Sequence, residues 1–220
     1  YDSDALEITC GRVSVELPTL NAQEYPQLPE TDDTMSPLLI APLLTALEAV
    51  SPFSSTDEAR PNLNSVLVEG REHGIARLVA TDGYTIAVVD VDCGVDQPFS
   101  ERLVPRDAVG ALIKALKSAQ RDGASSVEVL IGEGMIHLKS GMLRSSIRLL
   151  AETYVPYEGV IPTEHGSVAV IDVRELADEV NTVSSLDSDS LGRVRLSAEG
   201  DQLLIESEAD KGRISSAVTI

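Results

Sequence analysis

Apolar side chains recur at helical spacing in two segments of the chain and alternate with polar side chains in most segments between them. The first pattern predicts a helix over 42–51, because Pro42 is tolerated in a first turn and the periodicity ends at Ser51. The second predicts a helix that begins at Pro105. The predicted buried faces consist of Leu43, Leu44, Leu47 and Val50 in the first helix and Val109, Leu112, Ile113 and Leu116 in the second.

Alternation with a period of two predicts strands around these helices. The predicted strands are Leu38–Ile40, Ser65–Val68, Ala76–Ala80, Thr85–Val91, Ser126–Ile131, Met135–Lys139 and Leu143–Leu149. Asp82-Gly83 predicts a turn between the third and fourth of these, because this dipeptide suits the positive φ of tight hairpins. Helix, strands, helix, strands is the order of an α+β unit in which sheets and helices pack as two layers.

The pattern also repeats within the chain. Residues 11–26 and 141–156, which are 130 positions apart, each contain an alternating strand followed by an acidic residue, a Tyr and a Pro. The helical segment from Ile40 matches the one from Val173 at an offset of 133. These offsets predict a unit of about 130 residues. Its end occupies 1–31, a complete copy occupies 32–162, and its first half occupies 163–220.

Composition narrows the classes of function. The 220 residues carry a formal net charge of -19, and 43% are hydrophobic but only 3% aromatic. Affinity for phosphates comes mainly from Lys and Arg, so this charge argues against tight binding of nucleic acid or an anionic membrane. The longest apolar stretch, Pro37–Val50, is too short to span a bilayer. Cys10 and Cys93 lack the spacing of a disulfide framework or zinc site, which favours a reducing compartment.

No catalytic constellation stands out in the sequence. His73, His137 and His165 are isolated, and there is no nucleophile–base pair, phosphate-binding glycine loop or cluster of metal ligands. The sequence therefore predicts no catalytic residue, no metal site and no cofactor. A carboxylate pair such as Asp82 and Asp90 stays open as an enzymatic alternative, for which only the residue type argues.

One basic surface is predicted on the second helix. Lys114, Lys117 and Arg121 fall at i, i+3 and i+7, within about 60° of one another around the helix axis. We name these three residues the basic helix face. It is either an ordinary solvated helix surface or a surface presented to a polyanion, and the second explanation needs segregated charge rather than a positive total.

Four short motifs follow one another with domain-length spacing. They are STDEARPNLNSVLVE at 55–69, VATDGYTIA at 79–87, Val104-Pro105-Arg106 at the start of the second helix and YVPYEGVIP at 154–162. In order and spacing they resemble the middle domain of the bacterial DNA polymerase III beta sliding clamp family. Residues 5–30 resemble the end of the family's first domain, and 167–220 the first half of its third.

The resemblance implies tandem clamp domains with antiparallel sheets outside and paired helices lining a central channel. It implies a DNA replication processivity factor without a catalytic site, cytoplasmic and associated with the nucleoid. Its partners would be duplex DNA, held topologically without sequence preference, and the replicative DNA polymerase, clamp loader and repair polymerases, which bind through short linear peptides. The full-length protein would be a homodimeric ring that contacts no membrane, whereas a monomer stays open for this chain alone.

Two sites follow from the family's motifs, residue by residue. The partner-peptide pocket would be formed by Leu63, Thr81, Gly83, Tyr84, Thr85, Ile86 and Val160. Arg60, Asn62 and Arg106 would face DNA, and the helical geometry adds Lys114, Lys117 and Arg121.

Some positions depart from the family's pattern. Thr85 stands where many members have Arg, and Glu158, Gly159 and Asp107 stand where basic residues are frequent, so DNA binding is expected to be weak. The partial first and third units fit a fragment of a full clamp, a sequence with residues missing or a natural short variant. The alternative function is an adaptor or decoy that binds clamp-interacting peptides without encircling DNA.

Overall fold

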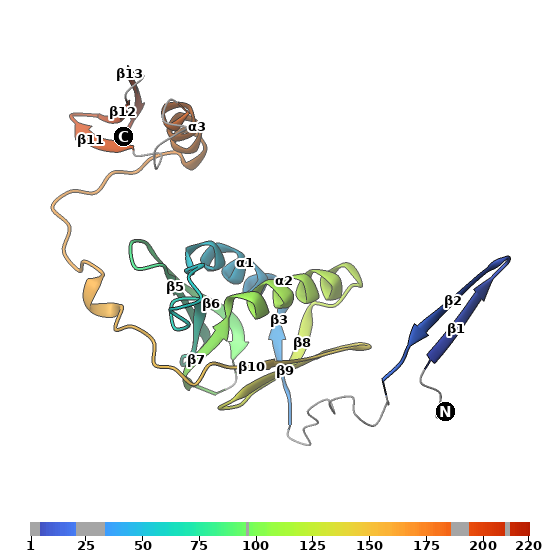
Figure 1. Ribbon diagram of the computed structural model, residues 1–220. Coiled ribbons are helices and arrows are strands. Elements are labelled where there is room, and N and C mark those ends of the chain that lie inside the picture. The colour runs from blue at the N-terminus through green and yellow to red at the C-terminus, as the bar shows by residue number, and fades with distance from the viewer. Residues whose placement is uncertain (1–4, 21–33, 96, 186–193, 210–211) are drawn as a thin grey trace. The chain divides into compact units, whose positions relative to one another are not determined.

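The computed structural model describes residues 5–20, 34–95, 97–185, 194–209 and 212–220. Contacts divide the chain into two units, Tyr1–Pro156 and Tyr157–Ile220, and each is described by itself (Figure 1). The sequence-based domains at 1–31, 32–162 and 163–220 stay predictions, and residues 21–31 of the first lie outside the described ranges.

Two helices and two four-stranded antiparallel sheets build most of the first unit. One sheet, in the order β10-β9-β8-β3, contains β3 (Ser36–Leu39), β8 (Ser126–Ile131), β9 (Met135–Ser140) and β10 (Leu143–Arg148). The other, in the order β6-β5-β4-β7, contains β4 (Ser65–Gly70), β5 (Gly74–Thr81), β6 (Ile86–Val95) and β7 (Phe99–Pro105). Helices α1 (Ile40–Val50) and α2 (Arg106–Arg121) lie side by side against both sheets (Figure 1). The α+β class is confirmed.

Both helices form where the apolar spacing predicted them. The buried residues are Ile40, Leu43, Leu44, Ala46, Leu47 and Val50 in α1 and Val109, Leu112, Leu116 and Ala119 in α2. Ile113, predicted to be buried, is only half-buried but packs against the same core. Pro42 lies in the first turn of α1, and Pro105 is the N-cap residue of α2. A 3₁₀ turn, η2 (Ser51–Phe53), ends the first helix. The helices thus join both sheets in one hydrophobic core.

Strand β7 was not predicted, because the polar residues 100–102 interrupt its apolar alternation. The strand pairs antiparallel with β4. Arg102 connects it to the other sheet, since Arg102 Nε donates to the carbonyl of Gly132 in the β8–β9 turn at 2.6 Å. The same guanidinium lies 5.9 Å from the centre of the Phe99 ring. A long-range polar contact therefore supports this strand, and local periodicity does not reveal such a contact.

Gly70 is expected to tolerate no side chain, because a Cβ atom there would lie 2.3 Å from the Phe99 ring. Gly70→Ala should lower the free energy of unfolding by about 1–3 kcal/mol, the usual cost of overpacking. Urea denaturation measures this change. The matched control is Gly110→Ala in α2, where nothing lies within 4 Å of an added Cβ. The control should stabilise by about 0.5–1 kcal/mol, since Ala favours a helix interior over Gly. Equal effects of the two substitutions would contradict the close packing at Gly70.

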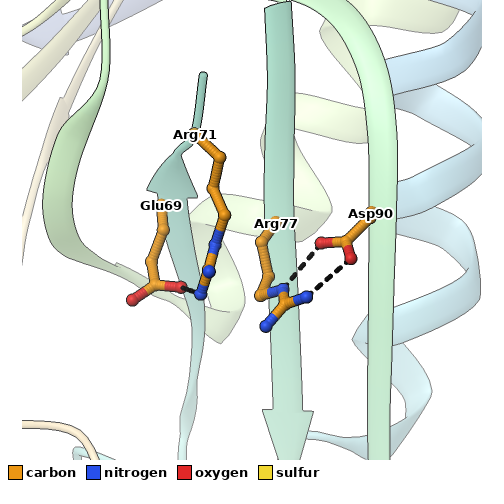
Figure 2. A network of polar contacts seen from close by, with 4 residues as sticks. All are labelled: Glu69, Arg71, Arg77 and Asp90. Atoms are coloured by element: carbon orange, nitrogen blue, oxygen red, sulfur yellow. Dashed lines mark hydrogen bonds and ion pairs between the residues drawn. The ribbon is translucent and has the colours of Figure 1, made fainter. Parts of the chain in front are cut away.

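Charged side chains pair across the strands on the face of the second sheet that points away from the core (Figure 2). Arg77 donates from Nε and Nη2 to the two carboxylate oxygens of Asp90, both at 2.6 Å. Arg71 Nη2 lies 2.8 Å from Glu69 Oε2. The hydrogen bonds from Arg77 lower the pKa of Asp90. Because Arg77 and Asp90 are directly opposite in the β5–β6 register, their pairing supports that register.

The hairpin of β1 (Ala5–Cys10) and β2 (Val13–Pro18) repeats β9 and β10 at the offset of 130 residues. Both hairpins turn at a glycine with positive φ, 60° at Gly11 and 56° at Gly141. The buried residues Ile136, Leu138 and Ile147 of the second hairpin correspond to Leu6, Ile8 and Leu17 of the first, which are 50%, 49% and 44% exposed. The first hairpin therefore exposes, in the described part of the chain, the side chains that a complete unit buries.

The second unit packs one helix on a three-stranded sheet. Helix α3 (Val173–Ser184) begins after Asp172, whose carboxylate accepts the N–H groups of Arg174 at 2.9 Å and Glu175 at 3.0 Å. The sheet has the order β11-β12-β13, with β11 (Arg195–Glu199), β12 (Gln202–Ala209) and β13 (Gly212–Thr219). Its core consists of Val183, Leu203, Ile205 and Val218. A 3₁₀ turn, η3 (Glu158–Val160), precedes α3. Helix α3 starts 133 residues after α1, as the repeat predicts.

Candidate functional site

A network of hydrogen bonds holds the turn that joins β5 to β6 at Thr81–Thr85. Asp82 Oδ1 accepts the N–H groups of Tyr84 at 2.8 Å and Thr85 at 2.7 Å, and the Thr85 hydroxyl at 3.0 Å. Thr81 Oγ1 donates to the Thr85 carbonyl at 2.6 Å and accepts the N–H of Gly83 at 3.1 Å. The backbone N–H groups, that of Thr85 above all, lower the pKa of Asp82. The turn predicted at Asp82-Gly83 is confirmed, and its shape is set by its own side chains.

Gly83 lies where this turn meets the loop over residues 54–64. Its φ of 96° falls in the left-handed region that favours glycine. A Cβ atom there would lie 3.7 Å from Arg60 Nη1. Arg60 in turn pairs with Asp57, with 2.8 Å between Nε and Oδ2. Arg60, predicted to face DNA, is thus a neighbour of the predicted peptide pocket. No local sequence signal announces this proximity, because the two residues lie on separate segments.

The predicted pocket residues differ in burial. Leu63 and Thr81 are buried, with exposed fractions of 8% and 7%, and Ile86 is half-buried. Gly83, Tyr84 and Thr85 are exposed, Tyr84 at 95%. Val160, which is 70% exposed, belongs to the second unit, and its membership of the pocket stays a prediction. The residues of the first unit offer apolar groups at the base and an exposed aromatic ring at the turn.

The basic helix face lines a shallow groove between α1 and α2. The groove has a volume of about 560 Å³ and is lined by Leu44, Glu48, Lys114, Lys117, Gln120 and Arg121. Lys114, Lys117 and Arg121 are exposed, and Arg121 Nε donates to the carbonyl of Lys117 at 3.3 Å. Lys117 Nζ lies 2.5 Å from Glu48 Oε1. The three cations share one surface, as their spacing predicts, and α1 adds an acid to it that the sequence did not indicate.

Arg106 and Asn62 both support local structure. Arg106 Nη1 donates to the carbonyl and hydroxyl oxygens of Ser54, the latter at 3.0 Å. The backbone N–H of Arg106 donates to the carbonyl of Asn64 at 3.2 Å. The carbonyl of Asn62 accepts the Ser65 hydroxyl at 2.7 Å. These contacts attach the 54–64 loop to the starts of α2 and β4, and DNA contact by Arg106 and Asn62 stays a prediction.

The two carboxylates of the enzymatic alternative serve the fold. Asp82 holds the turn, and Asp90 pairs with Arg77 through two hydrogen bonds. The pKa of each is lowered by its donors, so both are ionised near neutral pH, and neither is poised to donate a proton. Among the described residues there is no group of three or more His, Cys, Asp or Glu placed to hold a metal ion. Within the same ranges, no helix has the length and apolar character needed to cross a membrane.

Solved structures with the same arrangement of elements come from bacterial replication proteins. The DNA polymerase III subunit beta of Pseudomonas aeruginosa superposes with a TM-score of 0.85 at 22% identity, covering 100% of this chain and 59% of that one. The DNA polymerase sliding clamp of Bacillus subtilis gives a TM-score of 0.85 at 23% identity, covering 100% and 58%. The chain therefore has the fold of a sliding clamp.

Sequence comparison identifies the family. The model of the DNA polymerase III beta subunit, central domain, matches residues 41–156, which is more than half of the chain. The chain belongs to the DNA polymerase III beta subunit family, and the resemblance carried by the four motifs is confirmed. The beta sliding clamp of Streptomyces coelicolor is 29% identical over 201 residues, 90% of this chain and 53% of the relative. That of Chlamydia pneumoniae is 26% identical, covering 96% and 58%. The chain spans about half the length of the curated relatives it matches.

Proposed function

We propose that the protein is a DNA sliding clamp, a processivity factor of DNA replication that encircles duplex DNA and tethers a polymerase to it. The observation that carries the proposal is the repeated unit: a complete copy lies between a hairpin that repeats its end and a helix and sheet that repeat its beginning. Tandem copies of one unit suit a ring. In this proposal the protein catalyses no reaction and needs no cofactor, and it acts at the nucleoid as a homodimer.

The charge distribution supports sliding rather than tight binding. A net charge of -19 weakens attraction to phosphates overall, while the basic helix face concentrates three cations in one groove. Contacts to phosphates carry no sequence information, so a ring held by them would move along any duplex. We assign DNA contact to the basic helix face, and keep Arg60, Asn62 and Arg106 as further candidates.

The tether is proposed to be the surface around the Thr81–Thr85 turn. Leu63 and Ile86 offer apolar contacts, Gly83 admits close approach of a ligand backbone, and Tyr84 presents an exposed ring. Such a surface suits short linear peptides with apolar anchors, carried by the replicative polymerase, the clamp loader and repair polymerases. Val160 completes the set by its place in the family's motif. A sliding clamp from Bartonella birtlesii, 26% identical to this chain, has been solved bound to griselimycin, which is therefore a second probe.

Gly83→Val tests this surface. Valine is strained at a φ of 96° and adds methyl groups toward Arg60, so binding of a fluorescent clamp-binding peptide should weaken at least about tenfold, or 1.4 kcal/mol. Griselimycin should compete with the peptide on the unchanged chain. The matched control is Gly141→Val, which places the same residue at a positive φ in the β9–β10 hairpin and should leave peptide affinity unchanged. Equal affinity of the Gly83 variant and the unchanged chain, or no peptide binding by either, would remove the proposed tether.

A further inference from the structure

One acid lies within the groove that the basic helix face lines. Glu48 is the only charged residue of α1, and its side chain is 44% exposed. It reaches across to α2, where its Oε1 lies 2.5 Å from Lys117 Nζ. Lys117 is the middle member of the basic helix face, with Lys114 and Arg121 in the same groove. The carboxylate thus occupies the central cation of the surface proposed for DNA.

This contact does little for folding. Both partners are about half exposed to water, and ion pairs in that environment contribute little to stability because water screens them and ordering two long side chains costs entropy. The α1–α2 contact is maintained instead by the apolar side chains of the core, such as Leu47 and Leu116, which are each 1% exposed. The effect of Glu48 on what binds in the groove is therefore larger than its effect on the fold.

A duplex that docks on this face must compete with Glu48. Phosphate oxygens and the Glu48 carboxylate are both acceptors for the same ammonium group, so Lys117 must give up one contact to make the other. The carboxylate also repels the phosphates that approach Lys114 and Arg121. Each cation that neutralises a phosphate releases counterions and steepens the dependence of affinity on salt. An occupied Lys117 removes its share of both affinity and salt dependence.

We propose that Glu48 weakens duplex binding by competing with phosphate for Lys117, and so sets how tightly the basic helix face holds DNA. The proposal rests on the proposed function, because it needs duplex DNA on this face. It assigns to α1, which carries no basic residue, a role in tuning the DNA affinity of α2. A clamp that must slide is helped by such a brake on affinity, since each phosphate contact has to break at every step.

The test is a set of charge-neutralising variants of the 220-residue chain, titrated with a short blunt duplex at salt concentrations from about 50 to 200 mM. Fluorescence anisotropy of the labelled duplex gives the affinity. Glu48→Gln should bind about fivefold tighter at the lowest salt, with a salt slope steeper by about 0.9. Lys117→Gln should bind more weakly than the unchanged chain. In the double variant, Glu48→Gln should no longer raise affinity, because its effect acts through Lys117.

The matched control is Glu133→Gln in the β8–β9 turn, which changes the net charge equally at an exposed site outside the groove and should leave affinity unchanged. Thermal unfolding of every variant reports on the fold; damage to the fold would weaken binding, whereas the proposal requires it to tighten. If Lys117→Gln weakens binding and Glu48→Gln does not tighten it, the competition is wrong while the DNA surface stands. Tightening that persists without Lys117 also overturns it. If no variant binds duplex, both the competition and the DNA part of the proposed function are wrong, and peptide binding is judged separately.

Discussion

Loaded onto a nicked circular duplex, the full-length protein is expected to stay on the DNA through a high-salt wash and to leave once the circle is cut. The reason is that a closed ring is linked to a circle topologically, whereas contacts between exposed charges are screened. For a chain with a net charge of -19, ordinary electrostatic binding should vanish at high salt. Gel filtration of the DNA, with labelled protein and the clamp loader, measures the retained fraction before and after cutting.

The control for this experiment is the same plasmid cut before loading, from which the protein should slide off. Retention on linear DNA at high salt would indicate gripping rather than encirclement. Loss from the intact circle, together with peptide binding that depends on Gly83, would instead support the adaptor or decoy, which binds clamp-interacting peptides without enclosing DNA. Loss from the circle without peptide binding would contradict both functions.

Leu116→Ala should lower the free energy of unfolding by about 2–5 kcal/mol, the usual cost of removing a buried leucine side chain. Leu116 is 1% exposed and lies on α2 within the core shared by the helices and both sheets. The loss is large because the sheets confine the cavity from two sides, and a typical domain has only about 5–15 kcal/mol of stability in total. Urea denaturation followed by circular dichroism measures it.

The matched control is Leu143→Ala on β10, where the side chain is 38% exposed. Surface substitutions of this kind usually change stability by no more than about 0.5 kcal/mol, so the two leucines should differ clearly. Similar losses at both positions would mean that α2 does not join the sheets in a single core.

The helices could be predicted from the sequence because their signals are local. Apolar side chains at helical spacing and prolines at each start are enough to place α1 and α2 to within one or two residues. Strand β7 was missed because its support is a hydrogen bond from Arg102 to Gly132, which are 30 positions apart in the chain. Alternation predicts a strand only where one face of that strand is apolar.

The candidate sites divide in the same way. The turn at Asp82-Gly83 could be predicted, because its hydrogen bonds join residues at most four positions apart. The placement of Arg60 beside Gly83 and the pairing of Glu48 with Lys117 could not, because each joins two elements that only the packed fold brings together. Helical geometry predicted that Lys114, Lys117 and Arg121 share a face, but the residue that faces them from α1 depends on how the two helices pack.

The hydrogen bonds of Asp82 also have a kinetic consequence. A peptide that docks at Gly83 and Tyr84 meets a preorganised surface, so the entropy of ordering is paid almost entirely by the peptide. Peptides of different sequence should then arrive at similar rates and differ mainly in residence time. A site of this kind ranks competing partners by how long each one stays, which lets a polymerase and a repair enzyme take turns without any change in the shape of the protein.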